Sequence, residues 1–181
     1  MKRKSIPIER ENDLFIIVVS VFILFSITRM FIAGSGYFSL DAFLKYKWFG
    51  EPKSFLDLFF KWDSNWYLSI VKNGYSYVAD KQSNVAFYPL YPLFVKIIST
   101  VVGNTKAVGF LISNIGLLTG AFYLYRIILH ETKDHNICLI GVFLLLANPM
   151  SFFHSAFYAE GLFLGLTVAS FYYALQNKLL L

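Results

Sequence analysis

The chain has 181 residues, of which 57% are hydrophobic, 19% aromatic and only 15% charged. Its mean hydropathy of +0.57 is far above that of soluble proteins and predicts an all-α integral membrane protein. The formal net charge is +5, but the basic residues are scattered among apolar runs, so no nucleic-acid partner is expected. Because Cys138 is the only cysteine, a disulfide within the chain and a cysteine-based metal site are excluded.

The first apolar stretch, residues 14–33, has the length of one bilayer span. No small-residue cleavage site stands out at its end, so it is predicted to be a signal anchor, span 1. The positive-inside rule places the N-terminus in the cytoplasm, because basic residues precede this span: Lys2, Arg3, Lys4 and Arg10. The protein is therefore expected to be multi-pass, in the cell membrane if bacterial and in the endoplasmic reticulum if eukaryotic.

A long mixed segment, residues 34–106, is predicted to be an external loop with juxtamembrane helices. Within it, Pro89–Val102 contains Lys96 and is too short to span the bilayer. We interpret it as a juxtamembrane or re-entrant helix. A true span at this point stays open as an alternative, and it would place Asp63 and Glu160 on opposite sides of the membrane.

Three later segments complete a prediction of about four spans in a single membrane domain, residues 1–181: span 2 at 107–129, span 3 at 137–153 and span 4 at 160–176. The polar segments between and after them carry the cations that indicate cytoplasmic ends: Arg126, His130, Lys133, His135 and Lys178.

Asp63 stands between two tryptophans in "KWDSNWYLSIVK", residues 61–72. On one continuous helix it would fall within an aromatic face with Trp66 and Tyr67. A carboxylate at that place is costly unless it pairs or takes part in chemistry. Alternatively, the helix restarts at Ser64 and Asp63 is only its N-cap, accepting backbone N–H groups. The residues alone leave both interpretations open.

Glu160 has the same ambiguity, because it opens an apolar helix whose dipole favours a carboxylate there. Two carboxylates on one membrane face, each among aromatic residues, offer a base with a raised pKa and a second acidic group. His154 lies on the same loop and is either a hydrogen-bonded loop residue or a minor participant. Arg29 and Lys72 are candidate partners for a lipid phosphate, or else snorkelling cations.

Three motifs resemble, in order, the signatures of the PIG-V-type mannosyltransferases and their bacterial relatives, in the GT-C glycosyltransferase superfamily: "WDSNWYLSIVKNGY", "AFYPLYPLFVKII" and "NPMSFFHSAFYAEGLF". The resemblance runs from about Phe59 to Leu175. It implies an N-terminal span, a large first external loop with juxtamembrane helices and an active site at the outer membrane face. Asp63 matches the family's catalytic base. Phe157–Glu160 matches a "YSE"-type motif, with Ala159 in place of the hydroxyl residue.

The resemblance also implies the substrates. The donor is a polyprenyl-phosphate sugar, commonly mannose, and the acceptor is an external glycan, glycolipid or protein. Asp63 and Glu160 are the candidate catalytic residues, and the candidate substrate-binding residues are Trp62, Trp66, Tyr67, Tyr88, Tyr91, His154, Tyr158, Lys72 and Arg29. No metal or other cofactor is required, although a carboxylate pair could hold a divalent cation.

Family members usually continue with several more spans, so the chain is expected to be an N-terminal portion. Its expected partners are membrane lipid and a partner chain that supplies the missing spans. The alternative function is a non-catalytic membrane subunit or degenerate homologue that packs against a partner through its helices.

Overall fold

The computed structural model describes residues 11–44 and 54–176, and within these ranges it contains helices and no strand. The predicted all-α class is confirmed. Several residues that carry the orientation prediction lie outside the described ranges: Lys2, Arg3, Lys4, Arg10 and Lys178. Part of the predicted external loop, residues 45–53, also lies outside them.

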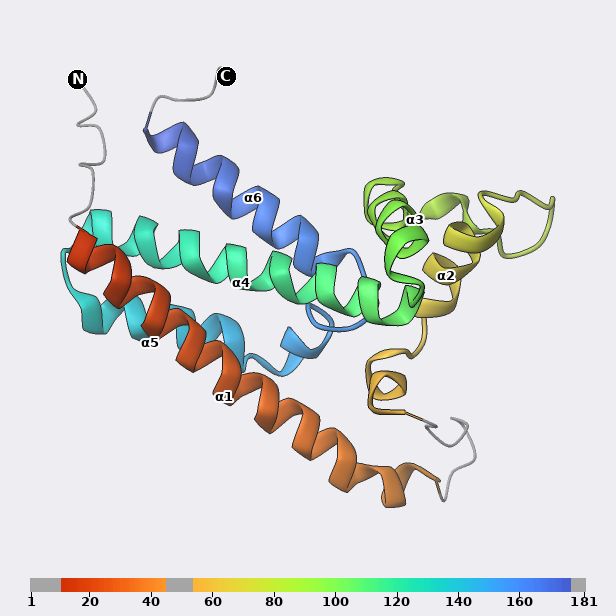
Figure 1. Cartoon of the computed structure of the whole chain (residues 1–181), viewed down its shortest axis with the longest axis horizontal. Coiled ribbons are helices and arrows are strands. Elements are labelled where there is room, and N and C mark those ends of the chain that lie inside the picture. The colour runs from red at the N-terminus through yellow and green to blue at the C-terminus, as the bar shows by residue number, and fades with distance from the viewer. Residues whose placement is uncertain (1–10, 45–53, 177–181) are drawn as a thin grey trace.

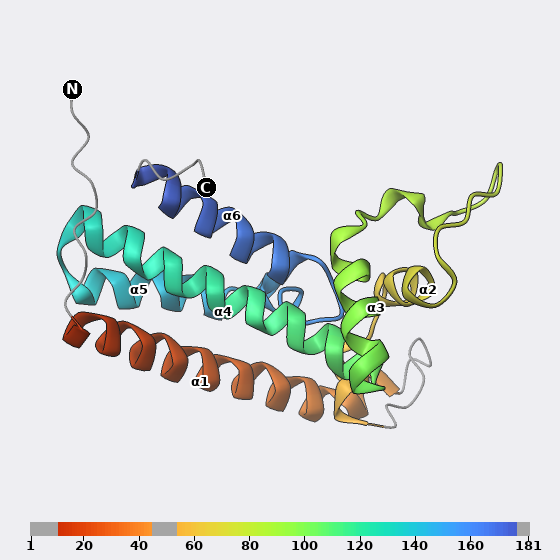
Figure 2. The ribbon, with the colours of Figure 1, turned by 45° about the horizontal axis from the view of Figure 1, so that its top comes forward.

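Four helices run alongside one another (Figures 1 and 2): α1 (Glu11–Leu44), α4 (Thr105–Thr132), α5 (His135–Ala147) and α6 (Glu160–Leu175). Helix α4 is central and packs against the other three. Apolar side chains from α1, α4 and α5 form a core between these helices: Ile17, Val21, Leu117, Ala121, Tyr125, Cys138, Val142 and Leu146. Where these helices lie in lipid, van der Waals contact between such closely packed side chains favours their association.

In the part of the chain that the structure describes, two helices are long and apolar enough to cross a membrane, at Asp13–Phe38 within α1 and at Thr105–Thr132. Predicted spans 1 and 2 lie within them. Helix α1 continues past residue 33 to Leu44, so the segment predicted as a loop from residue 34 begins as helix. Predicted span 4 lies on α6, which is apolar but shorter. The number of crossings stays a prediction.

Predicted span 3, residues 137–153, is not one helix. Helix α5 ends at Ala147 and a short 3₁₀ helix, η3 (Pro149–Phe152), follows it. Proline cannot continue a helix because it lacks the N–H group, and the Asn148 side chain accepts a hydrogen bond from the Met150 N–H at 2.7 Å. The break is therefore encoded locally, and it turns the chain into the loop that carries the third motif.

The backbones of α4 and α6 approach closely at three glycines, Gly116, Gly161 and Gly165. A Cβ at Gly165 would collide with the backbone of Gly116, and a Cβ at Gly161 would collide with the Ser113 carbonyl. Small residues that allow such close contact are typical of helix pairs in membranes. This contact sets where α6 begins, and therefore where Glu160 lies.

At one end of these four helices lie α2 (Ser64–Asn73) and α3 (Leu90–Val102), with two 3₁₀ helices, η1 (Phe55–Phe59) and η2 (Asn84–Ala86). The interpretation of the segment around Asp63 as one continuous helix is wrong, because the helical structure is interrupted between Phe59 and Ser64. The last residue of α5 and the first of α6 face the same end. The loop between them therefore meets η1 and α2.

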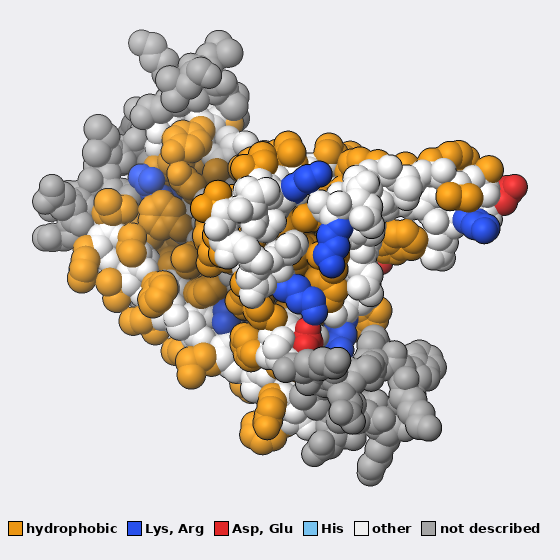
Figure 3. All heavy atoms as spheres, turned by 45° about the vertical axis from the view of Figure 1, so that its right-hand side comes forward, with side chains coloured by type: hydrophobic (Ala, Val, Ile, Leu, Met, Phe, Trp, Pro, Cys, Tyr) orange, Lys and Arg blue, Asp and Glu red, His pale blue; other side chains and the backbone are white. Residues whose placement is uncertain are grey.

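Helix α3 packs one face into the protein through Tyr91, Pro92 and Val95. The remaining surface of α3 is exposed and mostly apolar, with Lys96 as a charged residue on it. Its apolar residues are Leu93, Phe94, Ile97, Ile98 and Val101. Figure 3, which brings the α2 and α3 side forward, shows Lys and Arg side chains set among hydrophobic ones. Such a surface is typical of a helix lying in the membrane interface, and the juxtamembrane position of α3 remains our prediction.

Candidate active site

Two segments that are distant in sequence meet at the end of the helices: the turn at residues 60–63 and the loop at residues 153–159. The Phe157 N–H donates to the Phe59 carbonyl at 3.0 Å. The Tyr158 hydroxyl donates to the Lys61 carbonyl at 3.1 Å and accepts from the Asp63 N–H at 3.0 Å. These bonds join the first and third motifs into one structure.

Asp63 occupies the N-cap position of α2, as one interpretation of the sequence predicted, but its carboxylate makes no capping hydrogen bond. Its backbone carbonyl instead accepts from the N–H groups of Trp66 at 2.9 Å and Tyr67 at 3.2 Å. The side chain is exposed. The prediction that the Asp63 carboxylate caps the helix is therefore wrong, and its carboxylate does not stabilise the helix start through a bond.

Glu160 is the first residue of α6, exposed at the end of the helix before its apolar run. The pKa of its carboxyl group is raised from the ordinary value, first by partial burial, which disfavours the charged form, and then by the charge of Asp63. The pKa of the Tyr158 hydroxyl is raised to about 12, mainly by burial and then by the charges of Asp63 and Glu160. The two carboxylates thus lie within electrostatic reach of each other.

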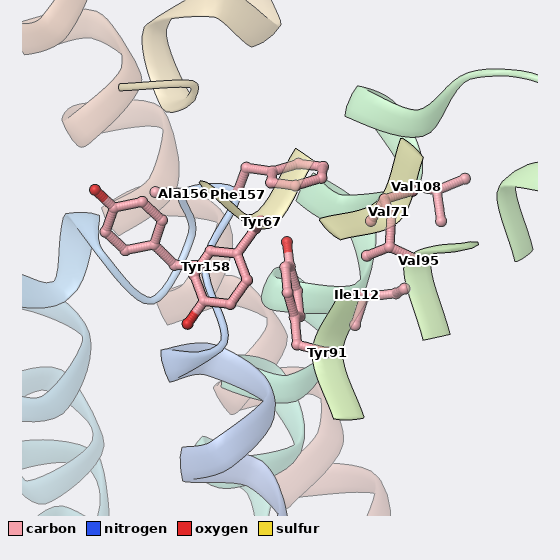
Figure 4. Close-up of a cluster of buried hydrophobic side chains, with 9 residues drawn as sticks. All are labelled: Tyr67, Val71, Tyr91, Val95, Val108, Ile112, Ala156, Phe157 and Tyr158. Carbon is pink, nitrogen blue, oxygen red and sulfur yellow. The ribbon is translucent and has the colours of Figure 1, made fainter. Parts of the chain in front are cut away.

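Figure 4 shows a cluster of buried hydrophobic side chains, whose aromatic members are Tyr67, Tyr91, Phe157 and Tyr158. The Tyr67 and Tyr91 rings meet edge to face with centroids 5.2 Å apart, and Tyr91 meets Phe157 at 5.7 Å. The Tyr91 hydroxyl donates to the Gly109 carbonyl at 3.1 Å and the residue is 1% exposed. Tyr91 was predicted to bind substrate. Its ring lies in the core, and its hydroxyl proton is donated to the Gly109 carbonyl there.

Other predicted substrate-binding residues lie at the surface. Trp62 is 54% exposed and its ring packs against Phe153 at 5.7 Å. Trp66 is half-buried and stacks on Phe87 at 6.3 Å. Tyr88 precedes α3 and is exposed, as is Lys72 in the last turn of α2. Roles of these residues in substrate binding stay predictions.

Arg29 holds the loop after α5 in place. From α1, its guanidinium donates to the Ser151 carbonyl at 2.9 Å, to Ser155 Oγ at 2.8 Å, to Ser151 Oγ at 2.9 Å and to the Leu146 carbonyl. A cation so engaged has few donors left for a ligand. These bonds anchor the loop, and Arg29 Nε is buried without a hydrogen-bond partner among the described residues. The predicted role of Arg29 in binding a lipid phosphate stays a prediction.

His154 is half-buried in the same loop. Burial, and secondarily the charge of Arg29, lower its pKa, so the imidazole is neutral at neutral pH. Its Nδ1 atom is buried and has no hydrogen-bond partner among the residues that the structure describes. The predicted contact of His154 with substrate remains untested.

Sequence reasoning missed the polar side chains that support the loop from α4. Ser113 Oγ donates to the Tyr158 carbonyl at 2.8 Å, and Ser155 Oγ donates to Asn114 Oδ1 at 2.8 Å. All three side chains are buried. The signal for them was the pair Ser113 and Asn114 inside an apolar helix, because such polar groups in a membrane helix need partners.

Among residues 11–44 and 54–176, no three His, Cys, Asp or Glu side chains gather closely enough to bind a metal ion.

These features define an all-α membrane protein with two neighbouring carboxylates at one end of its helices. Residues 50–179 match the family described as mannosyltransferase (PIG-V). The chain therefore belongs to the PIG-V mannosyltransferase family, and the resemblance noted in the sequence is confirmed.

One curated relative is a GPI mannosyltransferase 2 of Drosophila pseudoobscura pseudoobscura. The alignment is 115 residues long at 29% identity, and it covers 56% of this chain and 24% of the relative. The chain thus spans about a quarter of the length of the curated relative it matches. No solved structure matches the chain.

Proposed function

We propose that this chain carries the catalytic carboxylates of a membrane mannosyltransferase that transfers mannose from a polyprenyl-phosphate donor to an external acceptor with inversion. The observation that supports the proposal most strongly is the junction of the two motifs, where one hydroxyl, Tyr158 Oη, bonds both sides of the turn before Asp63. Membership of the family supports mannose as the sugar.

Asp63 is the proposed general base. Its carboxylate is exposed and makes no capping bond, so it is available to take the proton of an acceptor hydroxyl. As that oxygen attacks the anomeric carbon, the bond from this carbon to the phosphate oxygen breaks and the polyprenyl phosphate leaves with the electron pair. One displacement of this kind inverts the anomeric centre. A positioned base typically contributes about 10² to 10⁴ in rate.

Glu160 is proposed to bind a sugar hydroxyl next to Asp63. Its carboxylate oxygens can accept hydrogen bonds from sugar hydroxyls. Trp62 lies beside Asp63 and exposes half of its ring. It offers an apolar face for a sugar ring or for the first isoprene units of the donor.

We place this site at the outer membrane face, with α3 in the interface. Lys72 and Lys96 are exposed on α2 and α3, and cations at this depth would attract the phosphate of the leaving lipid. The acceptor in this arrangement is a glycan, glycolipid or protein that reaches the membrane surface from outside.

A donor comparison tests the proposal. Membranes from cells that express the chain are supplied with either radiolabelled mannosyl phosphoryl polyprenol or radiolabelled GDP-mannose, with endogenous synthesis of the lipid donor inhibited. We expect label to enter acceptor material from the lipid donor, above the level of membranes without the chain. Transfer only from the nucleotide sugar would contradict the proposed donor class.

A further inference from the structure

The turn that carries Asp63 is strained. Trp62 has a φ of 45°, which is in the left-handed region that residues with a Cβ rarely adopt. Such a conformation persists only where surrounding contacts hold it. The direction in which Asp63 leaves the backbone depends on this turn, because its carboxylate makes no capping bond of its own.

One side chain brackets the strained residue. The Tyr158 hydroxyl donates its proton to the Lys61 carbonyl, one residue before Trp62, and accepts from the Asp63 N–H, one residue after it. The hydroxyl therefore spans both peptide groups that flank the left-handed position. Its single proton is used by the turn and is not available to a ligand.

The Tyr158 ring is itself held firmly. The residue is 4% exposed, its ring stacks on Phe153 with centroids 5.6 Å apart, and its backbone carbonyl accepts from Ser113 Oγ at 2.8 Å. The neighbouring Phe157 N–H bonds the Phe59 carbonyl, at the end of η1. Contacts from α4, η1 and the loop thus fix where the hydroxyl points.

From this geometry we infer that Tyr158 is a positioning residue for Asp63: its hydroxyl holds the left-handed turn at Trp62 and so aims the Asp63 carboxylate. Sequence reasoning placed Tyr158 among the substrate-binding residues. The inference rests on the proposed function of Asp63 as a base, and it assigns the hydroxyl to the base rather than to the sugar. A misplaced catalytic group lowers the rate of the chemical step more than it weakens binding.

The test is Tyr158→Phe, which keeps the ring and removes the hydroxyl. We expect kcat for mannose transfer to fall roughly 10- to 100-fold with KM for the lipid donor unchanged. Loss of the bond to the Asp63 N–H should also speed hydrogen exchange in the peptide covering residues 60–67, by about tenfold for one hydrogen bond. The exchange measurement needs no activity.

A matched control is Tyr123→Phe. It removes a hydroxyl on α4 that is hydrogen-bonded to Tyr173 Oη on α6 at 2.9 Å. It should leave kcat and exchange at 60–67 unchanged. Unaltered exchange in Tyr158→Phe, or a raised KM at full kcat, would overturn the positioning role. If the unaltered chain transfers no sugar, the proposed function fails, and faster exchange in Tyr158→Phe would still identify the hydroxyl as the holder of the turn.

Discussion

Replacing Asp63 by asparagine is expected to lower mannose transfer by about 10² to 10⁴-fold, the usual contribution of a positioned base. Asparagine has nearly the same shape but cannot take a proton. Because the carboxylate makes no capping bond, the amount of folded protein in the membrane should stay unchanged. Transfer from the lipid donor and abundance by immunoblot, measured on the same membranes, check both parts.

Asp57→Asn is the matched control for that substitution. The Asp57 carboxylate accepts from Lys106 Nζ at 2.7 Å and from the Ser54 N–H at 2.9 Å. Weakening these bonds is expected to cost about 1 to 2 kcal/mol, so abundance is measured for this variant too. Transfer should survive the substitution. A non-catalytic subunit predicts another pattern, in which Asp63→Asn either changes nothing or lowers abundance and any activity in proportion.

Gly165→Val is the second substitution with a large expected effect. A Cβ at this position would collide with the backbone of Gly116, and two helix backbones cannot separate without opening the contact between α4 and α6. Overpacking is expected to cost about 1 to 3 kcal/mol, which is a large part of a typical protein's stability. The yield of monodisperse protein in detergent and its thermal midpoint should both drop.

The same substitution at Gly34 is the control. An added Cβ there meets nothing within 4 Å, although Gly34 is also a helical glycine in an apolar segment. Its yield and midpoint should match those of the unaltered chain. Equal losses at both positions would mean that the valine side chain itself, and not the close contact of α4 with α6, is responsible.

Much of this fold was predictable from the hydrophobic pattern. Long apolar runs identified α1 and α4, and the apolar run after Pro92 forms the short helix α3, whose juxtamembrane position stays a prediction. The break after α5 was missed because the apolar character of residues 137–153 continues through it. Only the backbone requirement of Pro149 and the Asn148 side chain end the helix.

The site was predictable in its residues more than in their roles. Asp63 and Glu160 stood out because carboxylates are rare among aromatic residues, and the structure brings them to one end of the helices. Arg29 and Tyr91 were assigned to substrate because a cation and an aromatic ring suit a lipid phosphate and a sugar. In the structure Arg29 bonds the loop and Tyr91 lies in the core. Both make hydrogen bonds to residues more than 15 positions away in the sequence, which local patterns do not indicate.

Asp63 and Glu160 are proposed to share one site on the outer membrane face, and cysteine labelling tests this most directly. In a background with Cys138→Ser, single cysteines are placed at exposed positions: Asn65 on α2, Met150 before Glu160, and Lys133 between α4 and α5. Intact cells are treated with a membrane-impermeant maleimide. We predict labelling at positions 65 and 150, and labelling at 133 only after permeabilisation. Labelling at position 65 without labelling at position 150 in intact cells would place the two carboxylates on opposite sides of the membrane. That result would contradict a shared site.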